Sequence, residues 1–215
     1  LNDSGDFLKT KILIYGAGAI GRGYIPWIFP NENYELSFVE NDSKIRNLML
    51  QQKKYTTYRT KNNKYEELVC RFKDCFNSGE ENPNDYDGII TAVGPRKVYS
   101  LVDSFKNVNC PIVLFENDSL LAPELRKLTG KENIFFGIPD VITSNTASEE
   151  MLKTDPLSII TEDGVCFVED GAVNLGGDIS YVDKDEIIKQ WAAKLYIHNT
   201  PHCIAAYLGA LAGKQ

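Results

Sequence analysis

The residue types best suited to chemistry gather near the end of the chain. Both histidines of the sequence lie in residues 194–202, which read KLYIHNTPH and also contain Lys194 and Asn199. Reduction of a carbonyl by hydride needs a proton donor at the developing alkoxide and polar groups that stabilise its charge. On a continuous helix, Lys194, His198 and His202 share one face and Asn199 lies farther round. The stretch predicts either a proton-transfer site or a surface helix with incidental lysine and histidine.

A glycine motif near the start of the chain predicts a cofactor that would work together with such a site. Gly16-Ala-Gly18-Ala-Ile-Gly21 follows an apolar strand and opens a helical pattern, as a dinucleotide-binding loop requires. The first glycine permits a tight turn, the second lets backbone approach a pyrophosphate, and the third lets helix and strand pack closely. The cofactor contacts expected from this loop are Gly16, Gly18, Ala19, Ile20 and Gly21. A turn that binds no nucleotide, or a site for a flavin or S-adenosylmethionine, is the alternative.

The identity of the dinucleotide depends on Glu40. This residue ends the next apolar strand, 19 residues after Gly21, where a carboxylate accepts hydrogen bonds from the adenosine ribose hydroxyls. A 2′-phosphate would be repelled there, and Asn41 rather than arginine follows, so NAD is predicted over NADP. Lys44 and Arg46 lie close enough to keep NADP open, and a solvated strand end is the alternative interpretation of Glu40.

The composition narrows the class of protein and its partners. The chain has 215 residues, of which 43% are hydrophobic and 25% charged, and a formal net charge of -7. The negative charge argues against a nucleic-acid binder, and no apolar stretch is long enough for a membrane span. Five cysteines without a CxxC pair suggest free thiols in a reducing compartment. We expect a cytoplasmic protein that acts on a small molecule, with no metal site.

Apolar runs alternate with helical patterns over most of the chain, which predicts a Rossmann-type, mostly parallel sheet with helices on both faces. The expected strands are 11–15, 35–40, 88–93, 112–116 and 133–137, and the expected helices are 19–29, 43–52, 96–105 and 120–128. Residues 55–60 and 65–72 look like an inserted hairpin, and residues 157–161 and 165–168 are short strands. Pro26 predicts a bend in the first helix.

The expected domain organisation follows from these patterns. Residues 1–8 are excluded as disordered or added sequence, residues 9–182 form the dinucleotide-binding domain, and residues 183–215 begin a helical substrate domain. The last segment reads as two helices separated by HNTPH, with Thr200 as N-cap and Pro201 at the first helical position.

Four stretches together resemble one enzyme family. They are Lys194-x4-Asn199-x2-His202 with the following IAAYLG, the loop GAGAIGRG from Gly16, TAVGP at residues 91–95, and Glu116-Asn117. This combination is similar to the polyol-specific long-chain dehydrogenases, the mannitol dehydrogenase family. The resemblance implies an NAD-dependent oxidoreductase that interconverts a polyol and a ketose, with mannitol 1-phosphate and fructose 6-phosphate as the first candidates.

The resemblance also implies residue roles. Lys194 would be the general acid and base, with a pKa lowered by burial beside the nicotinamide. Asn199 would hydrogen-bond the reacting oxygen, and His202 would orient the substrate. Asn117 would join Asn199, although by itself it is equally an N-cap of the following helix. The residues implied to line the cofactor are Val93, Gly94, Pro95 and Asn117, whereas His198 matches no motif position.

The chain departs from the family pattern in three ways. Trp191-Ala-Ala193 stands where an acidic residue often precedes the lysine, which puts a carboxylate proton relay in doubt. Asp140 is kept, but Ser144-Asn145 stand where Asp-Arg is expected. Family members also continue into a longer helical domain, so the chain is expected to be truncated, with the apolar helix 203–212 exposed and available for association with another chain.

Three alternatives stay open beside the polyol reaction. Hexuronate reductases acting on tagaturonate or fructuronate belong to the same family. A truncated module that binds NAD(H) without turnover is the second alternative. A ketopantoate-reductase-like enzyme would share the glycine loop and a lysine, but the Asn199 and His202 spacing argues against it.

Overall fold

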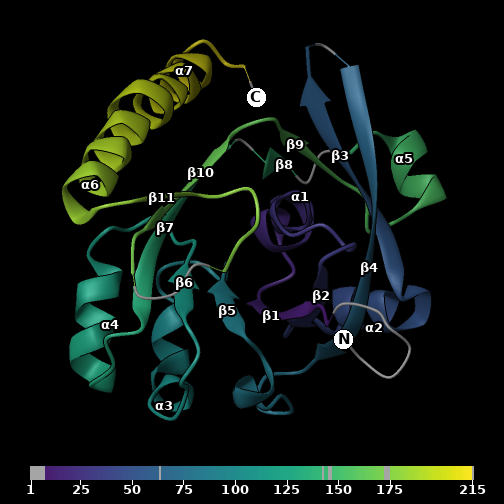
Figure 1. Cartoon of the computed structure of the whole chain (residues 1–215). Helices are drawn as coiled ribbons and strands as arrows, with labels where there is room; N and C mark the ends of the chain where they lie inside the picture. The colour runs from purple at the N-terminus through teal and green to yellow at the C-terminus, as the bar shows by residue number, and fades with distance from the viewer. Residues whose placement is uncertain (1–7, 63, 142, 145–146, 172–174, 215) are drawn as a thin grey trace.

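Short apolar runs form the centre of a parallel sheet. The computed structural model describes residues 8–62, 64–141, 143–144, 147–171 and 175–214. The central parallel strands, in spatial order, are β7 (Ile134–Asp140), β6 (Ile112–Leu114), β5 (Gly88–Thr91), β1 (Thr10–Tyr15), β2 (Tyr34–Val39) and β4 (Lys64–Phe76) (Figure 1). The predicted Rossmann-type sheet with helices on both faces is confirmed.

Antiparallel pairs extend this sheet at both ends. On one side β10 (Val165–Glu169) pairs antiparallel with β7 and carries β11 (Ser180–Val182). On the other side β3 (Lys54–Lys61) pairs antiparallel with β4 and parallel with β9 (Ile159–Glu162), and β9 carries β8 (Thr143–Ser144). The hairpin is therefore an integral part of the sheet, which has eleven strands within the described residues.

The helices fill the connections between strands and continue to the end of the chain. They are η1 (Ala19–Tyr24), α1 (Ile25–Ile28), α2 (Ser43–Gln52), η2 (Pro83–Asp85), η3 (Val98–Leu101), α3 (Val102–Phe105), α4 (Leu121–Thr129), α5 (Glu149–Thr154), α6 (Lys184–Ala193), η4 (Lys194–Asn199) and α7 (Thr200–Leu211). No described helix is both long and apolar enough to cross a membrane.

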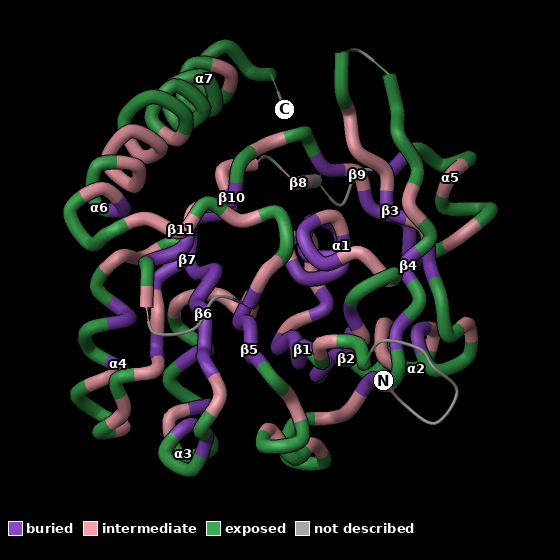
Figure 2. The backbone as a smooth tube through the Cα atoms, viewed as in Figure 1, coloured by how far each residue is buried: buried purple, intermediate pink, exposed green. Residues whose placement is uncertain are grey.

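Two apolar cores lie on the two faces of the sheet, and the buried strands between them appear purple in Figure 2. One core packs η1, α1 and the hairpin together, with edge-to-face contacts between Phe38 and both Tyr55 and Phe72. The other packs α3, α4 and α6 on the sheet, with Tyr15 against Phe105. Burial on both faces explains why the strands read as continuous apolar runs.

Pro26 shapes the first helix, as predicted, but through a change of winding. The Ile25 amide donates to the Ile20 carbonyl, an i→i−5 bond that marks η1 as a π-helical turn before Pro26. Proline also leaves the Arg22 carbonyl without its usual amide donor. Tyr55 Oη donates to that carbonyl at 2.9 Å, and Thr57 Oγ1 donates to the Gly23 carbonyl at 2.7 Å. Both carbonyls thus bind the hairpin, and for Arg22 the hydroxyl replaces the donor that Pro26 lacks.

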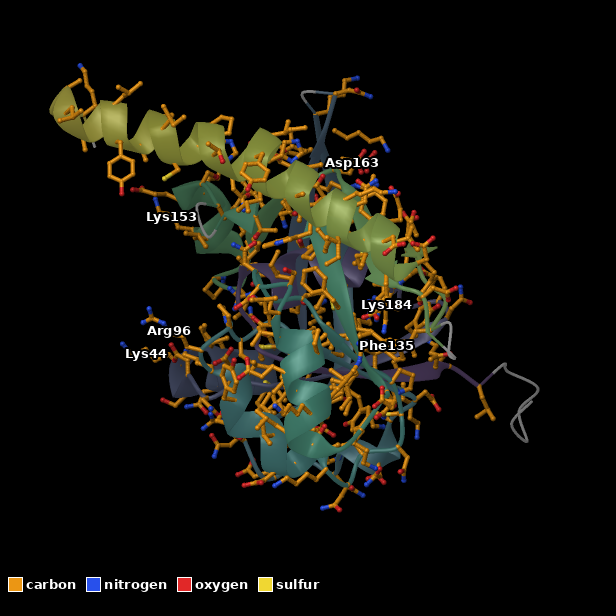
Figure 3. The ribbon with its side chains drawn as sticks, turned by 90° about the vertical axis from the view of Figure 1, so that its left-hand side faces the viewer. Lys44, Arg96, Phe135, Lys153, Asp163 and Lys184 are labelled. Atoms are coloured by element: carbon orange, nitrogen blue, oxygen red, sulfur yellow. The ribbon has the colours of Figure 1, made fainter. Side chains whose placement is uncertain are left out.

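The predicted break at HNTPH is wrong, because α6, η4 and α7 form one continuous helical rod, as Figure 3 shows along the top. Thr200 is not an N-cap: its amide and its hydroxyl both donate to the Leu195 carbonyl, the hydroxyl at 2.8 Å. A second π-helical turn before Pro201 therefore replaces the expected interruption. The apolar side chains of α7 are largely exposed, with Tyr207 at 70% and Leu211 at 85%.

A nearly buried ion pair joins α4 to β10 at one end of the sheet. We expect its disruption to destabilise the fold strongly. Arg126 Nη2 lies 2.6 Å from Glu169 Oε2, which also accepts the Phe136 amide at 3.2 Å, and both side chains are nearly buried. We expect Glu169→Gln to lower the free energy of unfolding by about 3–5 kcal/mol, because Arg126 is left buried without its counter-charge. Asp103→Asn, which breaks the exposed pair with Lys106, should leave urea denaturation unchanged. Equal effects of both variants would contradict this ranking.

Candidate active site

The glycine loop has the geometry that a bound pyrophosphate needs. Gly16 has φ +96°, and a Cβ there would collide with the Ala92 carbonyl oxygen. A Cβ on Gly21 would overlap the Gly16 carbonyl, so helix and strand can pack this closely only with glycine. Around Gly18 no heavy atom lies within 4 Å of such a Cβ. The loop is tight on two sides and open on the third, which fits a dinucleotide.

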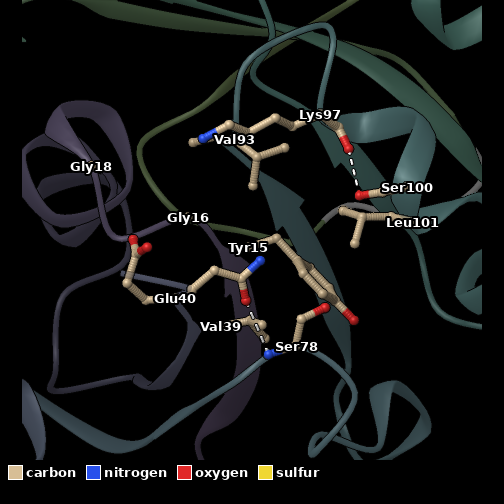
Figure 4. A pocket seen from close by; sticks show the side chains of 12 residues that line it. Tyr15, Gly16, Gly18, Val39, Glu40, Ser78, Val93, Lys97, Ser100 and Leu101 are labelled. Carbon is tan, nitrogen blue, oxygen red and sulfur yellow. Dashed lines mark hydrogen bonds between the residues drawn. The ribbon is translucent and has the colours of Figure 1, made fainter. Parts of the chain in front are cut away.

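Glu40 lies beside this loop at the end of β2. Its Oε2 accepts the Ala17 amide and its Oε1 accepts the Asp42 amide, both at 2.8 Å. In Figure 4 the carboxylate points towards Gly16 and Gly18. Each oxygen keeps a second lone pair that a ribose hydroxyl can use. Glu40 therefore holds the loop and still faces the cavity.

That cavity, of about 310 Å³, lies at the carboxyl ends of the strands. Its wall contains the predicted cofactor residues Gly16, Gly18, Glu40 and Val93. Other wall residues belong to no predicted motif and are far from the glycine loop in the sequence; they include Ser78, Lys97 and Ser100 of η3. Arg46 donates from Nη1 to the Glu40 carbonyl at 2.7 Å and to Asn77 Oδ1 at 3.2 Å, so its guanidinium serves backbone and loop structure.

Glu116 plays the same part for the loop after β5. It is 4% exposed, and its two carboxylate oxygens accept the amides of Val93 at 3.0 Å and Gly94 at 2.8 Å. Glu116 belongs to the Glu116-Asn117 pair of the family resemblance, which implied no role for it. A charged residue directly after the buried run of β6 was the available signal, because a buried carboxylate needs donors.

The second cavity, of about 520 Å³, brings the predicted catalytic residues together. Lys194, Asn199, His202 and Asn117 all line it. Ile20 of the glycine-loop helix lines it as well, so the two motifs, which are far apart in the sequence, meet at one place. Other lining residues include Gly137, Thr143 and Trp191.

The π-helical turn η4 explains which side chains face this cavity. On a regular helix Asn199 would lie away from the face of Lys194, as the sequence analysis expected. An i→i+5 turn winds through one more residue, so Asn199 comes to the Lys194 side. His198 lines a third cavity, and its Nδ1 lies 2.9 Å from Asp140 Oδ1.

Lys194 is held in a partly buried position between the helix rod and β7. Its Nζ donates to the Pro139 carbonyl at 2.6 Å. Burial lowers the pKa of Lys194, and the Asp140 carboxylate and the Cys166 thiol oppose that shift. The direction favours a lysine that can release and accept a proton nearer neutrality.

The remaining predicted residues have structural positions but untested roles. Asn117 is exposed and is not the N-cap of α4, because Asp118 Oδ1 accepts the Leu120 amide at 3.0 Å. Ala19 opens η1, and Pro95 follows Gly94 in the loop that Glu116 holds. Of the Ser144-Asn145 pair, Asn145 lies outside the described residues. The described part of the chain contains no cluster of three metal-ligating side chains.

The fold and the glycine loop define this chain as a Rossmann-type dinucleotide-binding domain followed by helices. Residues 10–111 match the family model of the mannitol dehydrogenase Rossmann domain. This half of the chain therefore resembles the mannitol dehydrogenase family.

Curated relatives carry the same resemblance over nearly the whole chain. Mannitol-1-phosphate 5-dehydrogenase of Thermoanaerobacter pseudethanolicus is 27% identical over 94% of this chain and 59% of its own length. The enzyme of that name from Clostridium acetobutylicum is 28% identical over 94% of this chain and 60% of its own length. The chain thus spans about 60% of the length of these relatives.

Solved structures share the fold at low sequence identity. Octopine dehydrogenase, in a structure with NADH and L-arginine, has a TM-score of 0.62 at 10% identity and covers 87% of this chain and 52% of its own. A ketopantoate reductase from Ralstonia eutropha has a TM-score of 0.58 at 16% identity, covering 81% and 57%. These likenesses describe the fold alone.

Adding one methyl group to the glycine loop should have different effects at Gly18 and at Gly21. Gly18→Ala should leave thermal stability unchanged, because the space is open, and should weaken NADH binding at least about tenfold by blocking the pyrophosphate. Gly21→Ala should lower the melting temperature, because the methyl group overlaps the Gly16 carbonyl. Calorimetry and NADH fluorescence titration separate the effects. Unimpaired NADH binding by Gly18→Ala would contradict the assignment of the open side.

The lowered pKa of Lys194 predicts a pH-dependent stability difference. A charged lysine is disfavoured in the folded chain, so removing it as Lys194→Met gives a stability gain at neutral pH. That gain should shrink as pH rises through the folded pKa towards the unfolded value of 10.5, where both states are losing the charge. The gain is measured as the difference in melting temperature between variant and parent across this pH range. The exposed Lys189→Met is the control, and a difference that grows with pH would refute the burial effect.

Proposed function

We propose that this chain binds NAD(H) and provides the hydride-transfer site of a dehydrogenase that interconverts a polyol and a ketose. The observation that carries the proposal is the cavity shared by Lys194, Asn199, His202 and Asn117 beside the glycine-loop helix. A proton donor and neutral polar groups at one point meet the needs of carbonyl reduction. In this organisation residues 9–182 hold the cofactor and residues 183–215 begin the substrate side.

The cofactor would lie along the carboxyl edge of the sheet. Its pyrophosphate would rest on the open side of Gly18, and its adenosine ribose would donate hydroxyl hydrogen bonds to Glu40. A carboxylate at that position favours NAD over a cofactor with a 2′-phosphate. The loop of Val93, Gly94 and Pro95, held by Glu116, would face the nicotinamide side. The bound nicotinamide would supply or accept the hydride.

The residues of the second cavity would transfer the proton, stabilise the reacting oxygen and orient the substrate. Lys194 would give a proton to the reacting oxygen during ketose reduction and take it back during polyol oxidation. The side-chain amides of Asn117 and Asn199 would donate hydrogen bonds to the same oxygen, where negative charge develops. His202, on the next turn of the helix, would orient a substrate hydroxyl.

For the substrate we propose mannitol 1-phosphate and fructose 6-phosphate first, because the curated relatives are mannitol-1-phosphate 5-dehydrogenases. Tagaturonate and fructuronate are the competing substrates within the family. A second candidate function is cofactor binding without turnover. It is favoured by the openness of the site, since Asn117 and His202 are exposed and α7 has no buried residue.

An assay of NADH oxidation tests the proposal. The chain is mixed with NADH and, in turn, fructose 6-phosphate, fructose, tagaturonate and fructuronate. We expect turnover with fructose 6-phosphate, and a loss of about 10²–10⁴-fold in kcat for Lys194→Ala because the proton donor is gone. Lys189→Ala, exposed on the same helix rod, is the matched control. NADH binding without turnover on any ketose would select the second candidate function, and failure to bind NADH would reject both.

A further inference from the structure

His198 lies beside the candidate active site but has no role in the proposed reaction. It lies one turn after Lys194, and its ring pairs with Asp140 at 2.9 Å. Asp140 directly follows Pro139, whose carbonyl accepts the Lys194 ammonium at 2.6 Å. Two consecutive residues at the end of β7 therefore hold two residues of η4, one through a carbonyl and one through a carboxylate.

A third cavity, of about 270 Å³, joins these groups. Lys194, Asp140 and His198 all line it, whereas Lys194 alone of the three also lines the second cavity. The His198 side chain is 53% exposed and that of Asp140 is 26% exposed. Lys194 and Asp140 are both partly buried, and the imidazole is the most exposed of the three groups. The space is large enough for a bridging water, which needs about 30 Å³.

The proposed reaction creates a need for such a path. Each reduction takes one proton from the Lys194 ammonium, and the amine must recover it from solvent before the next turnover. Cofactor and substrate would fill the second cavity and close that way to water. No carboxylate lies in the Trp191-Ala-Ala193 stretch just before the lysine. The third cavity is the opening that stays free.

We infer that Asp140 and His198 carry protons between Lys194 and solvent through the third cavity, an inference that rests on the proposed function. In ketose reduction a hydride goes to the carbonyl carbon and the Lys194 proton to its oxygen. A proton then passes from the His198 imidazolium by way of Asp140 and one water to the Lys194 amine. The half-exposed imidazole regains its proton from solvent, so one solvent proton is consumed per ketose. Polyol oxidation runs the same steps in reverse.

Other charged groups also face this cavity. Glu162 ends β9, and Asp163 begins the turn to β10. Asp163 is bound by Arg59 and Lys61, each at 3.1 Å. His202 lines both cavities, and its proposed role is with the substrate. On the buried side, Cys166 is the group of β10 that acts on Lys194.

Proton exchange at Lys194 tests the relay without needing turnover. Nitrogen-15 NMR of the lysine ammonium groups gives the exchange rate with water, and Lys194→Met identifies the signal. We expect His198→Gln and Asp140→Asn to slow exchange at Lys194 about tenfold in the NADH-bound chain, and the exposed Lys189→Gln to leave it unchanged. Loss of the Asp140 carboxylate alone would lower the pKa of Lys194 further and speed direct exchange. Slower exchange is therefore specific to a relay.

Kinetics provide the second measurement. In the NADH oxidation assay, His198→Gln should lower kcat with little change in KM, and added imidazole should restore the rate by replacing the missing proton carrier. Unchanged exchange in both variants, or a rate loss that imidazole does not restore, would overturn the relay. Absence of turnover in the parent chain would instead count against the proposed function, and the exchange rates would still decide the relay.

Discussion

The carboxyl edge of a parallel sheet leaves backbone amides that need acceptors, and two carboxylates supply them here. Glu40 at the end of β2 binds the Ala17 amide of the glycine loop, and Glu116 at the end of β6 binds the amides of Val93 and Gly94. Each carboxylate thus satisfies loop amides, and the amides satisfy the carboxylate. The surfaces that face the cofactor are thereby fixed by the protein itself.

Two prolines set the winding of the helices that meet at the site. Pro26 leaves the Arg22 carbonyl without its usual amide donor, and Tyr55 of β3 donates to that carbonyl instead. Before Pro201 a π-helical turn brings Asn199 to the side of Lys194. The same local rule, a missing amide donor, attaches the hairpin in one place and assembles polar side chains in the other.

Most of the fold could be predicted, because buried strands leave continuous apolar runs and amphipathic helices leave periodic ones. Short elements such as β8 and β11 contain too few residues for a pattern, and the hairpin's place in the sheet depends on β9, far along the chain. For the site, residue types and motifs predicted the members of the second cavity. The direction of His198 could not be predicted, because regular helical spacing fails in a π-helical turn. The role of Glu116 could not be predicted either, because a motif records residue types and not the backbone amides that a carboxylate binds.

The pairing of β3 with β9 has a consequence for how the chain folds. Thr57 lies opposite Ile159, 102 residues later, so this ladder closes one of the longest loops in the sheet. Contacts of such sequence separation form late. A ribosome will have exposed the hairpin for several seconds before residue 159 emerges, at about 5–20 residues per second. During that interval the outer side of β3 is an uncovered strand edge, which is where a chaperone would have the most to protect.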